Sequence, residues 1–358
     1  MQWAIDCGGM KEYWEVFENE PMAQGGCIWD WVDQSFREVD KDGKWYWTYG
    51  GDYGPKDVPS FGNFCCNGLV NAVREPHPHL LEVKKIYQNI KSTLIDKKNL
   101  TVRVKNWFDF SDLNEYILHW KVTGDDGTVL AEGNKEVACE PHATVELTLG
   151  AVQLPKTIRE AYLDLGWTRK KSTPLVDTAW EIAYDQFVLP ASGKVWNGKP
   201  SEAGKTTFEV DENTGALKSL CLDGEELLAS PVTISLFRPA TDNDNRDRMG
   251  AKLWRKAGLH TLTQKVVSLK ESKTSATAQV NILNVTGKKV GDATLEYTLN
   301  HNGSLKVQTT FQPDTTWVKS IARLGLTFEM NDTYGNVTYL GRGEHETYID
   351  RNQSGKIG

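Results

Sequence analysis

The sequence predicts a mainly β chain in which a short α/β segment precedes two antiparallel β units. From Leu100 onward, apolar and polar residues alternate with the period of two that is typical of strands burying one face. Before Leu100, apolar residues at helical spacing lead into a short apolar run, which is the order of elements in an α/β barrel. At 358 residues the chain exceeds what one hydrophobic core usually holds, so we expect two or three domains.

The α/β pattern occupies residues 1–95. Residues 9–18 place apolar and aromatic side chains at i, i+3, i+4 and i+7, which predicts an amphipathic helix. An apolar run predicts a buried strand over residues 26–31, and a second helix is predicted over residues 78–92. Because barrel strands present functional side chains at their C-terminal ends, we expect a polar cleft where the strand ends.

Two β units follow the α/β segment. Residues 96–190 contain alternating runs such as LTVRVKNWF and YILHWKVT, separated by turn residues, and predict an antiparallel sandwich. Residues 191–206 are rich in Gly, Ser and Lys and are interpreted as a linker. Strand patterns resume over residues 207–358, which predicts a second all-β unit with longer loops.

Composition and charge exclude several classes of partner. A net charge of −7 argues against nucleic acid, because phosphate binding needs a basic face. No apolar stretch approaches about 18 residues, so we expect no membrane span and a soluble protein, cytoplasmic or periplasmic. The six cysteines show no CxxC spacing and none is near a spaced histidine pair, so we expect reduced thiols rather than zinc ligands.

Residues 25–71 combine aromatic rings with amides and carboxylates. The apolar run ending at Trp29 meets Asp30 and Asp33, and an aromatic, glycine-rich loop follows before Asn67. Rings stack on the C–H faces of sugars, and fixed polar groups bind the hydroxyls. The pattern favours a sugar site, although a single tryptophan at a strand end serves equally well as core filler.

Several ordered blocks are long enough to indicate a family. They are WDWVDQS (Trp29–Ser35), YGGDYG (Tyr49–Gly54), FCCNGLV (Phe64–Val70), REPHPHLLEVKK (Arg74–Lys85) and GRGEHETYIDR (Gly341–Arg351). These blocks closely resemble family 2 glycoside hydrolases, specifically the long bacterial β-galactosidases. The resemblance implies a remnant of a TIM-type (β/α)8 barrel in residues 1–95 and an immunoglobulin-like β-sandwich in residues 96–190. It further implies part of a large antiparallel β-supersandwich in residues 207–358.

The resemblance also implies a reaction and three site residues. The parent reaction is the retaining hydrolysis of terminal β-D-galactosides. The position matching Trp29 forms the apolar floor against galactose, and Asn67 matches a residue beside the sugar and a bound sodium ion. The backbone carbonyl of Phe64 matches a second sodium ligand, and oxygen donors of this kind suit a hard cation. Outside the matched block, Asn67-Gly68 would be interpreted as a plain turn.

No catalytic residue is expected within the chain. The family uses two glutamates, and its nucleophile motif precedes the helix at residue 9, where this chain reads MQWAID. The acid/base glutamate and the magnesium ligands of the parent enzyme are expected further upstream. Asp30, Asp33 and Asp52 are therefore interpreted as structural carboxylates that hold loops. We expect the chain alone to be inactive.

Two other motifs resemble metal sites. His77 and His79 alternate with prolines, which constrain the backbone, and are interpreted as capping the following helix and packing against the barrel. The triplet Asp242-Asn243-Asp244 lacks the glycine and distal glutamate of a calcium loop. The resemblance places this triplet in a loop that reaches toward the active site.

Two functions from different classes remain open. The first is a portion of a β-galactosidase whose partners are a β-galactoside or galactose and either the missing catalytic portion or further copies of the chain. The second is a non-catalytic carbohydrate-binding or assembly subunit that complements a separate catalytic chain. A fragment without an independent role is a further alternative. A β-glucuronidase is a less well supported parent enzyme than a β-galactosidase, because β-glucuronidases lack the long C-terminal extension.

Overall fold

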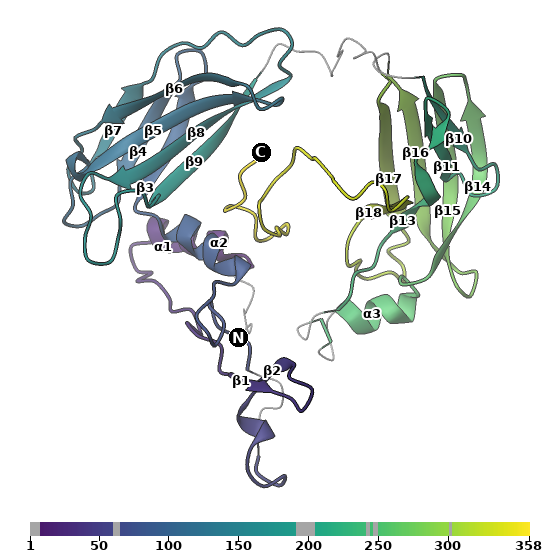
Figure 1. Cartoon of the computed structure of the whole chain (residues 1–358), viewed down its shortest axis with the longest axis horizontal. Coiled ribbons are helices and arrows are strands. Elements are labelled where there is room, and N and C mark those ends of the chain that lie inside the picture. Colours follow the sequence, from purple (N-terminus) through teal and green to yellow (C-terminus); the bar gives the residue numbers. More distant parts are fainter. Residues whose placement is uncertain (1–7, 60–64, 191–204, 241–243, 246–249, 301–302) are drawn as a thin grey trace. The chain divides into compact units, whose positions relative to one another are not determined.

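The computed structural model describes residues 8–59, 65–190, 205–240, 244–245, 250–300 and 303–358. The chain divides into two compact units (Figure 1). The first unit is Met1–Lys194 together with Tyr339–Gly358, and the second is Val195–Thr338. The segment Tyr339–Gly358 thus groups with the N-terminal unit, although the sequence places it in the terminal sandwich.

The first unit contains an antiparallel β-sandwich, which confirms the predicted fold class. One sheet has the strand order β3-β4-β7 and the other the order β6-β5-β8-β9. The strands are β3 (Ile90–Asp96), β4 (Thr101–Asn106), β5 (Tyr116–Gly124), β6 (Val129–Glu136), β7 (Thr144–Thr148), β8 (Glu160–Arg169) and β9 (Ala183–Pro190). Alternation places every second side chain in the core, where Leu118 faces Trp167 across the β5–β8 pair and both are fully buried.

Two helices precede this sandwich. Helix α1 (Met10–Asn19) confirms the prediction for residues 9–18 to within one residue. Helix α2 (Pro78–Tyr87) ends earlier than expected, because Ile90 begins β3 and is fully buried in the sandwich core. The two helices contact each other through the stacked rings of Trp14 and Tyr87, whose centroids are 4.2 Å apart.

The strand predicted over residues 26–31 is not formed. In this region the structure has an isolated parallel bridge between Val32 and Val70, and residues 26–31 belong to no strand. A parallel barrel strand is stabilised by neighbours on both edges, which this part of the chain does not provide. Part of the aromatic loop instead forms a hairpin of β1 (Phe36–Val39) and β2 (Trp45–Thr48), followed by the 3₁₀ turn η1 (Gly50–Asp52).

The C-terminal segment Tyr339–Gly358 is fixed to α2 and β9 by hydrogen bonds. Glu82, which is 1% exposed, accepts the backbone N–H groups of Gln353 at 3.1 Å and Ser354 at 2.9 Å. The Tyr184 hydroxyl donates to the Ser354 carbonyl at 2.7 Å. Charge-assisted bonds to a buried carboxylate are among the stronger hydrogen bonds in proteins, so Glu82 anchors the segment.

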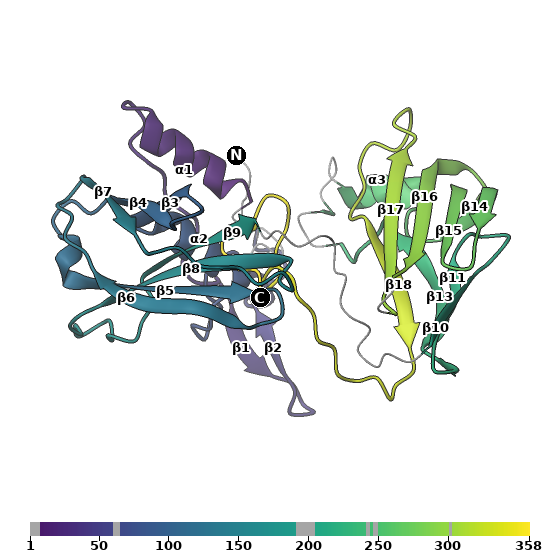
Figure 2. The same cartoon turned by 90° about the horizontal axis from the view of Figure 1, so that it is seen from above.

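The second unit is also mainly β (Figures 1 and 2). Its largest sheet has the order β14-β15-β16-β17, with a three-stranded sheet β10-β11-β12 and a pair β13-β18 beside it in the same unit. The elements are β10 (Thr206–Val210), β11 (Leu217–Leu222), β12 (Glu225–Glu226), β13 (Leu228–Ser235), α3 (Gly250–Ala257), β14 (Leu262–Glu271), β15 (Ser275–Asn284), β16 (Lys289–Leu299), β17 (Leu305–Pro313) and β18 (Gly325–Met330).

The core of the second unit follows from strand alternation. Ala278, Val280 and Ile282 point inward from β15 and pack with Leu295 and Tyr297 of β16. Most of the predicted linker, residues 191–204, lies outside the described residues, as do Asp242 and Asn243 of the acidic triplet. Among the described residues, no helix has the length and apolar character needed to cross a membrane.

Candidate functional site

Backbone hydrogen bonds bring together the two segments that carry the predicted site residues. The Asp30 N–H donates to the Asn67 carbonyl at 2.9 Å, and the Gln34 N–H donates to the Cys65 carbonyl at 2.7 Å. Trp29 immediately precedes Asp30, which makes the first of these bonds. The structure therefore places Trp29 and Asn67 on adjoining segments, although they are far apart in the sequence. Phe64, the third predicted site residue, lies outside the described residues.

The side chains of Trp29 and Asn67 have opposite environments. Trp29 is 68% exposed, whereas Asn67 is 2% exposed. Within the part of the chain that the structure describes, neither the amide oxygen nor the amide nitrogen of Asn67 has a hydrogen-bond partner. A buried polar group without a partner costs about 1–3 kcal/mol, so such a group in a native fold suggests a ligand, ion or water. Asn67 thus combines burial with two open hydrogen-bonding atoms.

A buried network fixes the loop that presents Asn67. Asp33 accepts the Gly68 N–H at 2.8 Å, and its second carboxylate oxygen lies 2.9 Å from Nε2 of His77. Nε2 of His79 lies 2.7 Å from the Gly68 carbonyl. Gly68 lies so close to the segment that contains Asp33 that a Cβ there would be 2.2 Å from the Asp33 nitrogen. Asp33, His77 and His79 are therefore structural residues of this loop.

The capping role predicted for His77 requires a correction. His77 occupies the N-cap position of α2, but its side chain makes no capping hydrogen bond. The imidazole instead pairs with Asp33, a charged partner that attracts the ring more strongly than a backbone N–H. Packing of the two imidazoles is observed: the rings of His77 and His79 stack with centroids 5.3 Å apart.

Asp30 and Asp52, the other two carboxylates singled out from the sequence, also hold turns. Asp30 accepts the Trp31 N–H at 2.6 Å and the Gln34 side-chain amide at 3.1 Å. Asp52 accepts the Tyr49 N–H at 2.9 Å within η1. These bonds agree with the interpretation of Asp30 and Asp52 as structural carboxylates. Among the described residues, no group of three or more His, Cys, Asp or Glu side chains is arranged to hold a metal ion.

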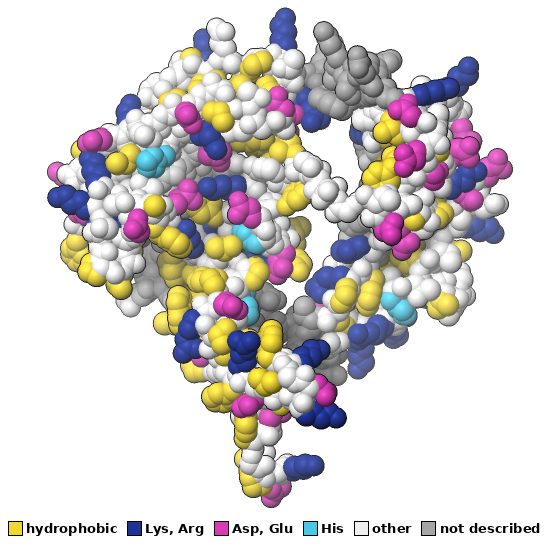
Figure 3. Space-filling view, in the orientation of Figure 1, with side chains coloured by type: hydrophobic (Ala, Val, Ile, Leu, Met, Phe, Trp, Pro, Cys, Tyr) yellow, Lys and Arg dark blue, Asp and Glu magenta, His cyan; other side chains and the backbone are white. Residues whose placement is uncertain are grey.

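Hydrophobic side chains remain on the surface around the site. Phe36, Trp45 and Tyr46 of the β1–β2 hairpin are exposed, as is Trp31. Figure 3 shows hydrophobic side chains gathered on the surface over the part of the chain that carries this hairpin. Exposed aromatic faces are suited to stacking against a sugar or to packing against another protein surface.

Two adjacent thiols lie beside Asn67, and the sequence analysis did not single them out. The sulfur atoms of Cys65 and Cys66 are 3.7 Å apart. Cys66 is exposed, but the pKa of its thiol is raised to about 12. The larger cause is partial burial, which disfavours the charged thiolate, and the second is the neighbouring Cys65. The adjacency of two cysteines was visible in the sequence, whereas the distance between their sulfurs was not.

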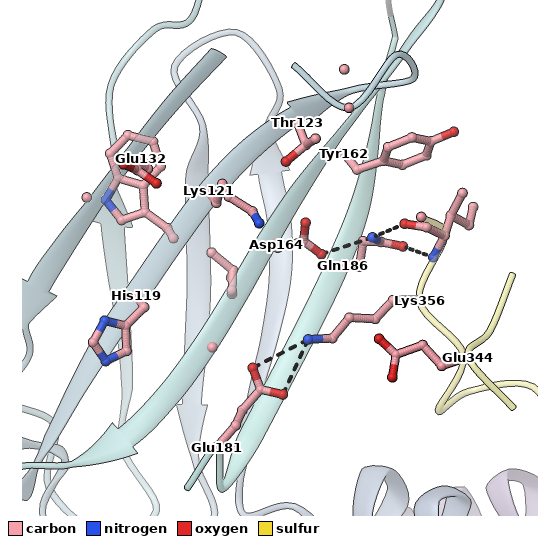
Figure 4. A pocket seen from close by; sticks show the side chains of 18 of the residues that line it. His119, Lys121, Thr123, Glu132, Tyr162, Asp164, Glu181, Gln186, Glu344 and Lys356 are labelled. Atoms are coloured by element: carbon pink, nitrogen blue, oxygen red, sulfur yellow. Dashed lines mark hydrogen bonds and ion pairs between the residues drawn. The ribbon is translucent and has the colours of Figure 1, made fainter. Parts of the chain in front are cut away.

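A second candidate site is a groove of about 950 Å³ on the sheet β6-β5-β8-β9 (Figure 4). The C-terminal segment forms one side of it: Gln186 exchanges two hydrogen bonds with the backbone of Ile357, and Lys356 pairs with Glu181 at 3.3 Å. Burial raises the pKa of Asp164, which accepts a hydrogen bond from Gln186. Other polar residues that line the groove are His119, Lys121, Thr123, Glu132, Asn134 and Glu344.

Three family models together match most of the chain. Residues 1–92 match "Glycosyl hydrolases family 2, TIM barrel domain", and residues 102–190 match "Beta-galactosidase, domain 4". Residues 202–358 match "Beta galactosidase small chain". The candidate residues Trp29 and Asn67 lie in the first of these ranges.

Curated relatives agree with the family models. A β-galactosidase of Priestia megaterium is 32% identical over 98% of this chain, and one of Aeromonas hydrophila is 30% identical over 98%. The chain spans only 35% and 36% of the lengths of these two relatives. Among solved structures, an exo-chitosanase of Amycolatopsis orientalis matches 74% of this chain and 29% of its own at 13% identity, with a TM-score of 0.25.

The family models and the relatives indicate the same assignment. The matches run from the N-terminal barrel segment through the sandwich to the second β unit, in one order and without internal conflict. The chain therefore belongs to glycoside hydrolase family 2 and corresponds to a C-terminal portion of the β-galactosidases of that family.

Proposed function

We propose that the chain is part of a retaining β-galactosidase that hydrolyses terminal β-D-galactosides, and that it supplies one side of the sugar site. The observation that carries the proposal is Asn67, buried with both amide atoms unpartnered beside the segment of the exposed Trp29. The relatives' name supports the substrate class. Because this chain covers about a third of their length, the activity belongs to the larger protein.

The two side chains have complementary roles in this proposal. The exposed Trp29 ring offers an apolar face for the C–H face of galactose. The amide nitrogen of Asn67 would donate to a sugar hydroxyl, and its amide oxygen, with the carbonyl of Phe64, would hold a sodium ion. The donor chemistry fits, because the Asn67 oxygen is buried and open and sodium prefers oxygen ligands. A bound sodium would supply a fixed positive charge next to the sugar.

The proposal places the reacting carboxyl groups in another part of the enzyme. Retaining hydrolysis needs two carboxyl groups about 5–5.5 Å apart, one as nucleophile and one as acid/base. Asp30 and Asp33 are instead committed to hydrogen bonds within the loop. We therefore propose that the chain works with a catalytic portion, and that magnesium, if the enzyme uses it, binds in that portion.

Galactose is expected to bind the isolated chain with millimolar affinity at best and without dependence on sodium. Trp29 and Asn67 form only one side of a pocket, so most of the sugar stays hydrated, and the residues lack a full supporting shell. Titration with galactose, monitored by tryptophan fluorescence in sodium chloride and again in potassium chloride, measures the affinity and its dependence on sodium.

Two substitutions make this titration specific. Trp29→Ala should remove the weak response, while Trp31→Ala, which changes a neighbouring exposed ring, should leave it. Micromolar saturation that depends on Trp29 would show a complete site and contradict the proposal of a half-site. Equal responses of the two variants would contradict the role given to Trp29.

A second candidate function is carbohydrate binding in the groove of the sandwich, as a non-catalytic module. Four acidic residues line the groove against two lysines, so its charge disfavours anions. Carboxylates and amines together accept from and donate to the hydroxyls of a neutral saccharide, and Trp120 adds an aromatic side chain. The sandwich on which the groove lies contains a larger cluster of buried hydrophobic residues than the helices α1 and α2 do.

Isothermal titration with galacto-oligosaccharides tests this candidate. Lys121→Ala is expected to weaken binding, because Lys121 lines the groove and is exposed. Lys97→Ala, an exposed lysine outside the groove lining, is the matched control and should not change the affinity. Equal affinity of Lys121→Ala and the parent chain would reject the groove as a saccharide site.

A further inference from the structure

Cys65 and Cys66 present two thiols from a fixed stretch of backbone. Their sulfurs are 3.7 Å apart. The Cys65 carbonyl accepts the Gln34 N–H at 2.7 Å, and the Asn67 carbonyl accepts the Asp30 N–H at 2.9 Å, so the backbone is held on both sides of the pair. Cys66 is exposed and Cys65 is half-buried, so neither residue lies in the closed core of the unit.

The geometry disfavours a disulfide between these neighbours. Two Cα atoms joined by a trans peptide are about 3.8 Å apart, whereas disulfide-linked residues usually have Cα atoms about 4.4–6.8 Å apart. The sulfurs would also have to approach from 3.7 Å to about 2.05 Å. A pair held in this way stays a dithiol unless the loop rearranges.

The sulfur spacing instead suits two bonds to one thiophilic centre. Two sulfurs bonded at about 2.3 Å to one centre are about 3.8 Å apart at a tetrahedral angle and about 3.3 Å apart at the angle near 90° of a pyramidal trivalent centre, so the observed pair needs little or no movement. Zinc needs four ligands, and the described residues contain no group of three or more His, Cys, Asp or Glu side chains arranged to hold a metal. The pair therefore suits a centre that is satisfied by two sulfurs and brings its remaining ligand with it.

We propose that Cys65 and Cys66 form a bidentate site for monosubstituted trivalent arsenicals, R–As(OH)₂. Two As–S bonds form and two As–O bonds break. Each thiol proton leaves with a hydroxide as water, so two waters are released per arsenic. Arsenic remains trivalent and no electrons are transferred, so the step needs no oxidant or reductant.

Bidentate binding predicts resistance to monothiols. Once one As–S bond has formed, the second sulfur is already in place and acts at a high effective concentration, so a free monothiol competes poorly with it. A soluble dithiol has the same advantage and should remove the arsenical. This pattern distinguishes the pair from a single reactive cysteine.

Phenylarsine oxide is the probe for the experiment, followed by native mass spectrometry of the full chain. One phenylarsenic group is expected per chain, retained in excess 2-mercaptoethanol and released by 2,3-dimercaptopropanol. Cys65→Ser and Cys66→Ser should each lose the retained adduct. Cys27→Ser, which changes another exposed cysteine, should keep it. A wild-type chain without a monothiol-resistant adduct would overturn the proposal.

Peptide mapping of the wild-type adduct gives a second readout that does not depend on variants that fold. Arsenic on the peptide that contains Cys65 and Cys66 supports the proposal. Arsenic on a peptide that contains Cys7, Cys27, Cys139 or Cys221 instead overturns it. The site is argued from sulfur geometry alone, so its test is independent of whether galactose binds.

Discussion

The isolated chain is expected to leave a chromogenic β-galactoside unhydrolysed, with a rate equal to that of buffer. General acid–base catalysis alone contributes about 10²–10⁴-fold, and a retaining enzyme loses its covalent intermediate as well when the nucleophile is missing. Asp30 and Asp33 cannot replace the two glutamates, because their oxygens accept hydrogen bonds that hold the loop around Asn67. The expected loss is therefore of several orders of magnitude.

The assay follows release of nitrophenol from a nitrophenyl β-galactoside through each step of purification. A rate that copurifies with the chain and disappears in Asp30→Asn or Asp33→Asn, but not in Asp52→Asn, would contradict the expectation. Complementation tests whether the chain contributes to a working sugar site when a catalytic portion is supplied. Adding a polypeptide that carries the upstream barrel and its glutamates should restore turnover, and Trp29→Ala should reduce the restored rate while Trp31→Ala should not.

The sequence predicted those elements whose pattern is local. Helix α1 follows from a stripe of apolar residues within a single helix, and strands such as β5 and β8 follow from alternation along each strand. The prediction of a strand over residues 26–31 was wrong, because a parallel barrel strand depends on neighbouring strands that the local sequence pattern does not encode. The early end of α2 reflects the burial of Ile90 in the sandwich, which is a tertiary effect.

The candidate site was predicted only in part for a related reason. Trp29 and Asn67 were singled out from the sequence, and the structure brings their segments together. The Asn67 amide is buried without a described hydrogen-bond partner because of how the whole surrounding loop folds, so this property could not be predicted from the sequence. The same holds for contacts between distant residues, such as Glu82 with Ser354, and for the groove that the C-terminal segment completes.

Gly68→Ala is expected to destabilise the loop that carries Asn67 strongly. A Cβ at Gly68 would lie 2.2 Å from the Asp33 nitrogen, 2.3 Å from the Val32 carbonyl carbon and 2.7 Å from the Val70 oxygen. All three are backbone atoms held by the hydrogen bonds that join the two segments, so no side chain can move aside. Overpacking of this kind typically costs about 1–3 kcal/mol, and rigid backbone neighbours favour the upper end of that range.

Hydrogen exchange gives the local readout of this prediction. The amides of Asp33 and Leu69, which bond across the two segments, should exchange faster in Gly68→Ala, while amides of the sandwich core should not. Gly50→Ala is the matched control, because a Cβ there meets no atom within 4 Å and the backbone is not left-handed. Protection of Asp33 and Leu69 that is equal in the two variants would show that the segments are not held together as described. In that case the burial of the Asn67 amide, on which the proposed sugar site rests, would lose its structural basis.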